Sequence, residues 1–384
     1  MHRREDGMPY QLSDDEALIQ QTVRSFAQGI GLERAADMDR HDRPSAEVLQ
    51  EGANLGLCGL ALPPEQGGAG PSAFALAVDE VAQVCPNTAA LLAVQNQAVA
   101  VLAAAGAPAE MLQAAASGTR TTVLAAEEAT GSNSLQPNST ARRDGDGWSI
   151  TGQKVWGLGA AVAQQHLVLA QATDGEASGP TLFLVPAAAP GVGLSRPEAI
   201  MGLRASGIRT VYLSGVKVED ARRVGAVGEG ARLLRAGRAW LQVGCAAALG
   251  GCIAGALAAA TAFAQSRVQF GQPIASYQAV SDTLANADVT LHAARSLTLA
   301  AAARLGLPEG EVWAARAKAF AVEGALVATR QAIRVQGGTG FMREGGTERF
   351  ARDARALQFV GEPAVVQRDT VRRALLDIEL APTP

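Results

Sequence analysis

One carboxylate near the carboxyl end of the chain stands where it could act on a substrate. It lies in the segment 360–369, which reads VGEPAVVQRD, between Gly361, which frees the backbone, and Pro363, which restricts it. A carboxylate that a loop holds in place, here Glu362, can act as a general base and take a proton. A carboxylate at the exposed tip of a loop is only solvated. The residues alone leave both interpretations open.

The cysteines and histidines do not indicate a second kind of chemistry. The cysteines form no C-x-x-C pair and have apolar neighbours, which predicts buried, inert thiols. The histidines are scattered along the chain without the spacing of metal ligands, so we expect no metal site. The residues concerned are Cys58, Cys85, Cys245 and Cys252, and His2, His41, His166 and His292.

The composition narrows the class of protein. The 384 residues carry a net charge of -4, and the basic residues are interspersed with acidic ones, which argues against nucleic-acid binding. No apolar run follows the charged amino terminus, so we expect a cytoplasmic protein. The apolar run 244–264 is nearly long enough to cross a bilayer, but it consists mostly of Ala and Gly. We therefore predict a packed interior helix and no membrane association.

Periodicity predicts the elements that would position the carboxylate. Ser13 and Glu16 form a capping box, followed by apolar residues at helical spacing up to Gly31, where the helix is expected to stop. The whole segment 1–120 is predicted to be helical. From residue 121 to 226, short β-branched segments separated by Gly, Asp and Pro predict a β domain. The alternation in residues 209–218 indicates a sheet with one buried face.

Long helical patterns return in residues 227–384. Four of them, at 231–267, 277–306, 311–336 and 364–380, predict a C-terminal four-helix bundle. The predicted fold is thus α+β and multidomain, with an N-terminal helical domain, a middle β domain and a C-terminal four-helix bundle.

This order of domains, together with five segments, resembles the acyl-CoA dehydrogenase family of FAD enzymes over about residues 12–380. The segments are AAEEATGSNS (125–134), ITGQKVWGLGA (150–160), MGLRASGIRTVYLSGVKV (201–218), RVQFGQPI (267–274, with Gln278 following) and RVQGGTGF (334–341, with ERFARDAR at 348–355). Each segment alone is a weak signal, whereas five in this order and spacing are specific.

The resemblance implies a cleft in which FAD and an acyl thioester stack between helices and the β domain. It places Gly131 and Ser132 at a turn that approaches the cofactor, and Trp156 beside the flavin ring. Other residues would contact the adenosine and pyrophosphate, in part from a neighbouring subunit, which implies a homo-oligomer, either a dimer or a tetramer. They are Arg267, Phe270, Gln278, Arg334, Gly337 and Gly338.

The chain departs from the family at the catalytic base. An alignment without gaps places Gly361 where the family has its glutamate, so that Glu362 stands one residue late. Some relatives carry the base on the first bundle helix, at the position of Leu241. A shift of one residue moves a Cα by about 3.8 Å, and misplacing a catalytic group by about 1 Å can cost roughly 10²-fold in rate. The freedom of Gly361 still allows a shifted register to bring Glu362 into place.

Further departures affect the predicted flavin contacts. Leu158 replaces a threonine that bonds the flavin, and each lost hydroxyl bond removes about 1 kcal/mol. Arg334 replaces a glutamine and could pair with a phosphate. The remaining substitutions are Ala126 for threonine, Glu128 for proline, Asn133 for aspartate and Gln242 for arginine.

Three functions are therefore compared. The leading hypothesis is FAD-dependent α,β-desaturation of an acyl-CoA or carrier-bound acyl thioester, with an electron-transfer flavoprotein as redox partner. The second is elimination of a β-leaving group in the same cleft, for which no strong base is required. The third is a non-catalytic partner subunit or scaffold of a heteromeric acyl-CoA dehydrogenase.

Overall fold

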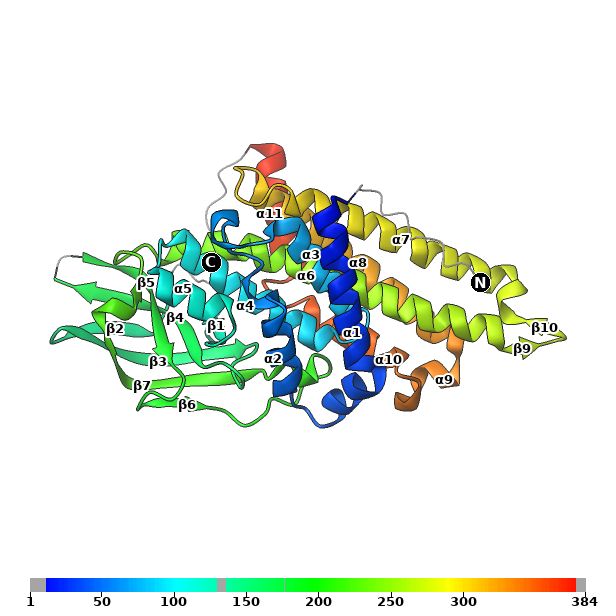
Figure 1. The fold of residues 1–384 in the computed structure, drawn as a ribbon, viewed down its shortest axis with the longest axis horizontal. Coiled ribbons are helices and arrows are strands. Elements are labelled where there is room, and N and C mark those ends of the chain that lie inside the picture. Colours follow the sequence, from blue (N-terminus) through cyan, green and yellow to red (C-terminus); the bar gives the residue numbers. More distant parts are fainter. Residues whose placement is uncertain (1–11, 130–135, 176, 378–384) are drawn as a thin grey trace.

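The computed structural model describes residues 12–129, 136–175 and 177–377. Helices, strands and again helices follow one another along the chain, which confirms the predicted α+β fold. In Figure 1 the sheet lies at one end of the molecule, long bundle helices extend to the other end, and the N-terminal helices cross the middle. The segment that contains Glu362 joins two C-terminal helices that pack against the long bundle helices.

The N-terminal part is helical, as predicted. Its helices in the described residues are α1 (Asp14–Arg40), α2 (Ala46–Asn54), α3 (Gly70–Ala82), α4 (Pro86–Ala104) and α5 (Ala109–Ala116). The capping box is present: Glu16 N donates to Ser13 Oγ at 3.2 Å, and Ser13 N donates to Glu16 Oε2 at 2.9 Å. The predicted stop at Gly31 is wrong, because Gly31 (φ 71°, ψ 154°) only kinks α1. The strong helix formers beyond it resume the helix to Arg40.

The β domain is a mixed sheet with strand order β6-β7-β3-β2-β4-β5-β8, and β1 pairs with β4 in parallel. The alternation predicted near residue 212 is present, since Val211 and Leu213 are buried while Tyr212 is 43% exposed. The central strands are covered on both faces, one of which packs against α4, α5 and α6. The strands are β1 (Thr122–Ala125), β2 (Thr140–Asp144), β3 (Gly147–Gly157), β4 (Gln165–Asp174), β5 (Ala177–Pro186), β6 (Val192–Leu194), β7 (Arg209–Glu219) and β8 (Arg223–Val224).

The C-terminal part contains the predicted long helices and two further ones. They are α6 (Gly230–Ser266), α7 (Gln278–Ala302), α8 (Gly310–Gln336), α9 (Gly338–Phe341), α10 (Thr347–Leu357) and α11 (Ala364–Leu376), with the hairpin of β9 (Val268–Gln269) and β10 (Gln272–Pro273) between α6 and α7. Two glycines let α6 approach α4 closely. A Cβ at Gly237 would lie 2.4 Å from Val101, and one at Gly244 would lie 2.8 Å from Ala93.

The most apolar helices form the core. By length and composition α4 and α6 could each cross a membrane, but 89% and 72% of their apolar windows are buried inside the fold. This burial confirms the predicted interior helix around residues 244–264. The four cysteines are free and buried, as predicted.

Candidate functional site

Glu362 lies in the turn that joins α10 to α11. Gly361 (φ 63°) and Glu362 (φ 77°) both adopt the left-handed backbone conformation, and Pro363 then caps α11. Glycine adopts this conformation freely, whereas for a residue with a Cβ it costs about 1–2 kcal/mol. Such strained residues persist only where their surroundings hold them, and they cluster at functional sites.

Polar side chains from two helices hold this turn. Lys318 of α8 is fully buried, and its Nζ donates hydrogen bonds to the carbonyl oxygens of Val360, Gly361 and Glu362. Gln367 of α11 adds two bonds, from its Nε2 to the carbonyl oxygens of Gly361 and Glu362, both at 3.2 Å. The backbone that presents Glu362 is therefore fixed before any substrate binds.

The carboxylate of Glu362 is not a solvated loop tip. Its side chain is only 14% exposed, and Oε1 lies 3.3 Å from Nη2 of Arg238 on α6. Burial raises the pKa of Glu362 above its ordinary value although Arg238 opposes the shift, and the charge of Glu127 raises it further. A carboxylate whose pKa is moved toward neutrality is suited to accept a proton at physiological pH.

The two positions at which the resemblance implies a base lie against each other. Leu241 is buried, and a Cβ built on Gly361 would lie 2.9 Å from its Cδ2 and 3.0 Å from its Cγ. A larger side chain at residue 361 would therefore require Leu241 to move. The side chain of Leu241 thus occupies the space beside residue 361, where the family's glutamate would lie. The carboxylate comes from residue 362 instead.

Trp156 presents an exposed aromatic surface on the β domain. Trp156 of β3 has a positive φ of 55° and is 64% exposed, so its ring is available for stacking. The adjacent Val155 N donates to the carbonyl oxygen of Glu127, the residue whose charge acts on Glu362. Leu158 is buried in the core, and it offers no hydroxyl to a flavin. The indole surface fits a flavin ring, with one hydrogen bond fewer than the family arrangement.

The predicted cofactor turn at Gly131 and Ser132 lies outside the described residues, but the structure shows what anchors the chain on either side of it. The carboxylate of Glu128 accepts hydrogen bonds from Lys154 Nζ at 2.6 Å and from the backbone N of Asn138 and Ser139 at 2.6 and 2.9 Å. Lys154 is fully buried. Glu128 thus provides a polar anchor where the family has a proline.

The anchor predicts a pH-dependent stability. Burial alone would raise the pKa of Glu128, but the hydrogen bonds from Lys154 and Ser139 outweigh it and lower the pKa to about 2. The stabilisation is therefore complete above the ordinary pKa of 4.5 and is lost as the pH falls toward 2. We expect Glu128→Gln to lower the free energy of unfolding more at pH 7 than at pH 3.5, as measured by urea titration at both values. An equal loss at the two pH values would contradict this assignment.

The other predicted cofactor residues lie on elements of the C-terminal helical part and not on the sheet that contains Trp156. Phe270, at the tip of the β9–β10 hairpin, is 94% exposed. Arg267, Gln278 and Arg334 are also exposed. A Cβ added at Gly337 or Gly338 would have nothing within 4 Å, which leaves their backbone open to an anion. Figure 1 shows this hairpin and α9 at the opposite end from the sheet, so one chain does not bring the two groups together.

The polar residues of α4 belong to the core. Gln95 donates to the carbonyl oxygen of Ala115 and accepts from Thr122 N, both at 2.8 Å. Asn96 accepts from Ala61 N at 2.9 Å. These are satisfied buried amides within the core.

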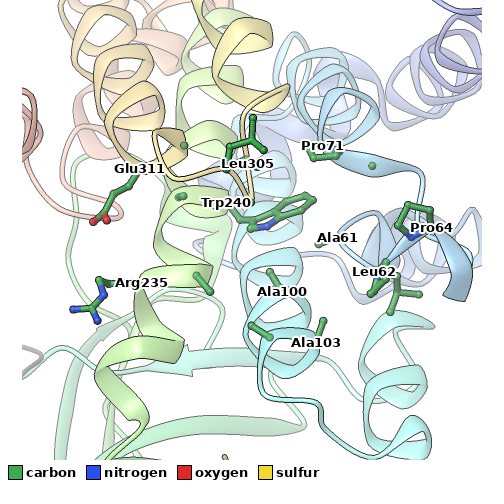
Figure 2. Close-up of a pocket in the computed structure, with 18 of the residues that line it drawn as sticks. Ala61, Leu62, Pro64, Pro71, Ala100, Ala103, Arg235, Trp240, Leu305 and Glu311 are labelled. Carbon is green, nitrogen blue, oxygen red and sulfur yellow. The ribbon is translucent and has the colours of Figure 1, made fainter. Parts of the chain in front are cut away.

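A cavity of about 490 Å³ lies on a different face of α6 from Glu362. Figure 2 shows Trp240 extending across it, with Arg235 and Glu311 at one side, Leu62 and Pro64 at the other, and alanines of α4 below the ring. The face of α6 that lines the cavity contains residues 235, 236, 239 and 240. The face that contacts the turn of Glu362 is a different one and contains Arg238, Leu241 and Cys245. Glu311 belongs to both regions, because it lines the cavity and its Oε1 lies 3.7 Å from Arg238 Nη1.

Sequence reasoning missed the residues that support Glu362. Arg238 precedes Leu241 by one helical turn, so helical spacing could have placed it beside the base position. Lys318 had no such signal, because a single lysine in a long helix is more often solvated.

Comparisons with known proteins agree with the three-part fold. Acyl-CoA dehydrogenase family models match in order, the N-terminal domain at residues 13–119, the middle domain at 122–216 and the C-terminal domain at 228–376. Cyclohex-1-ene-1-carbonyl-CoA dehydrogenase of Geobacter metallireducens is 33% identical over 95% of this chain and 99% of its own length. The 3-sulfinopropanoyl-CoA desulfinase of Paraburkholderia xenovorans is 31% identical over 97% and 98%. The structure of butyryl-CoA dehydrogenase from Megasphaera elsdenii has a TM-score of 0.90 at 25% identity, covering 96% of this chain and 100% of that one.

Proposed function

The chain belongs to the acyl-CoA dehydrogenase family, and on that premise we propose that it desaturates an acyl-CoA thioester between Cα and Cβ with Glu362 as the base. The observation that carries this proposal is the state of Glu362: a strained, ion-paired and largely buried carboxylate beside the two positions at which relatives place their base. A surface residue with no role would not be held in this way.

In the proposed reaction the Cα–H bond of the thioester breaks and its proton bonds to a carboxylate oxygen of Glu362. The electron pair forms the Cα=Cβ bond as the β-hydrogen leaves as hydride, for which FAD, when bound, supplies the acceptor. Lys318 and Gln367 keep the turn in position, and Trp156 provides the stacking surface for the flavin ring. We also propose that an electron-transfer flavoprotein reoxidises the flavin and that the protein is cytoplasmic.

The cofactor site would be shared between subunits. The β9–β10 hairpin and α9 lie at the far end of the bundle from the sheet to which the strand of Trp156 belongs (Figure 1), so we infer that a single FAD contacts both groups only if a second copy supplies one of them. The exposed Phe270, Phe341 and Met342 favour such an interface.

This arrangement predicts complementation between defective subunits. Trp156→Ala removes the stacking surface, and Gly338→Asp places a carboxylate where the pyrophosphate would bind. Each homo-oligomer should bind FAD weakly. Refolding the two variants together in equal amounts should restore about a quarter of the wild-type FAD content, because half of the dimers are mixed and each has one intact site. No recovery, with oligomers of normal size, would contradict a shared site.

Butyryl-CoA is the first thioester to test, because butyryl-CoA dehydrogenase of Megasphaera elsdenii is among the similar structures. Octanoyl-CoA is the matched long-chain comparison.

A second candidate is elimination of a β-substituent. It is favoured by Leu158, which replaces the hydroxyl that would bond the flavin, and by the similarity to the Paraburkholderia desulfinase. Elimination would use the same proton acceptor but transfer no hydride.

Mass analysis of the thioester after incubation with the FAD-loaded protein distinguishes these functions. Loss of two hydrogens with consumption of an electron acceptor supports desaturation. Loss of a β-substituent with the acceptor unused supports elimination. An unchanged thioester, together with co-purification of a second homologue, would overturn both and favour a non-catalytic partner subunit.

A further inference from the structure

Arg238 lies between two carboxylates that come from different parts of the chain. Its Nη2 is 3.3 Å from Oε1 of Glu362, and its Nη1 is 3.7 Å from Oε1 of Glu311 at the start of α8. The side chain of Arg238 is 26% exposed, that of Glu362 14% and that of Glu311 37%. The three groups therefore form a partly buried triad with two negative charges and one positive charge.

Three other charged groups act on Glu362, but two of them are negative and the third donates its hydrogen bonds to the backbone. From α8, Lys318 directs its ammonium at three backbone carbonyls of the turn. From the end of β1, Glu127 adds a negative charge, as does Glu311. On α6, the residues one turn from Arg238 are the uncharged Leu241 and Gln242 on one side and Arg235 on the other, and Arg235 lines the cavity together with Glu311. In the described part of the chain, the ion pair of the Glu362 carboxylate is with Arg238.

We propose that Arg238 is the positioning residue for Glu362, keeping it ionised and directed at one place, and that Glu311 is the counter-ion that remains with Arg238 once Glu362 has accepted a proton. The proposal rests on the proposed function, in which Glu362 is the base. The triad has a net charge of -1 before proton transfer and 0 afterwards, so at neither stage does a partly buried guanidinium lose its last partner.

The triad predicts in which direction the protonation midpoint of Glu362 moves when either of the other two side chains is removed. Without Arg238, Glu362 would share a partly buried site with the like charges of Glu311 and Glu127, which disfavours its ionised form. Its protonation midpoint should therefore rise. Without Glu311, one repelling charge is removed, so the midpoint should fall.

The test measures the titration of Glu362 directly and needs no turnover. The carboxyl stretching band in infrared difference spectra is assigned to Glu362 by its absence in Glu362→Gln, and it is then followed with pH. We expect Arg238→Gln to raise the midpoint by about one pH unit or more, Arg238→Lys to raise it less, and Glu311→Gln to lower it. Arg232→Gln is the matched control, because Arg232 pairs with Glu229 on the surface of the same helix; it should leave the midpoint unchanged.

Activity provides the second readout. In Arg238→Gln the acidic limb of kcat/KM should move to higher pH together with the infrared midpoint, and activity should recover as the pH rises. A purely structural role would lower activity equally at all pH values. An unchanged or lowered midpoint in Arg238→Gln would overturn the proposal.

The role of Arg238 and the proposed function can fail separately. A raised midpoint in Arg238→Gln, without thioester turnover in any variant, would support the pairing and reject the proposed function. Turnover that depends on Glu362, with an acidic limb that Arg238→Gln does not move, would support the function and overturn the role of Arg238.

Discussion

Glu362→Gln is expected to reduce thioester turnover by about 10²- to 10⁴-fold, the usual contribution of a general base. Glutamine keeps the length of the side chain and the backbone strain at residue 362, but it cannot accept the α-proton. FAD binding should be unchanged, because Glu362 belongs to the helical side of the site and Trp156 to the sheet. Steady-state kinetics on the FAD-loaded variant measures the effect.

Glu110→Gln is the matched control for this experiment, since Glu110 is exposed on α5 and should leave turnover as in the wild type. If Glu362→Gln turned over as fast as the control, Glu362 would not be the base. The loss must also persist at saturating thioester, because a base acts on kcat as well as on kcat/KM.

Lys318→Met should lower the free energy of unfolding by about 3 kcal/mol. Lys318 Nζ donates to three carbonyl oxygens of a partly buried turn, and bonds from a charged group contribute about 1.5–3 kcal/mol each. Two effects reduce the sum: Gln367 still bonds two of these carbonyls, and methionine removes the cost of burying an ammonium group. Urea unfolding at a fixed oligomeric state gives the value.

Lys217→Met provides the comparison, because Lys217 is 69% exposed and pairs with Asp144 at the surface. Its substitution should change stability by less than about 0.5 kcal/mol. Turnover should also fall in Lys318→Met, since about 1 Å of displacement at Glu362 can cost roughly 10²-fold. Equal stability of the two variants would show that Lys318 does not hold the turn.

The architecture could be predicted because its signals are local. The capping box at Ser13, the β-branched segments of the middle domain and the apolar periodicity of the bundle each specify their own element. The error at Gly31 has the same origin: a glycine ends a helix or kinks it according to the residues after it, and here those residues are helix formers.

The state of Glu362 could not be predicted, because it depends on residues distant in the chain. Arg238 and Lys318 reach the turn from α6 and α8. Helical spacing places Arg238 beside the position of Leu241 but does not indicate its pairing with residue 362, and Lys318 carries no sequence signal at all. Alignment alone placed Glu362 one residue after the position of the family's glutamate. This describes where its Cα lies along the chain. It did not show that the left-handed backbone at residues 361 and 362 turns the carboxylate into a largely buried position.

The most direct test of Glu362 as the base of a dehydrogenase is an anaerobic titration of the FAD-loaded protein with butyryl-CoA, followed by the visible absorption of the flavin. We predict that the flavin bleaches with the wild-type chain and stays oxidised with Glu362→Gln. A wild-type protein that binds FAD but leaves it oxidised with butyryl-CoA and with longer thioesters would contradict the assignment of a dehydrogenase.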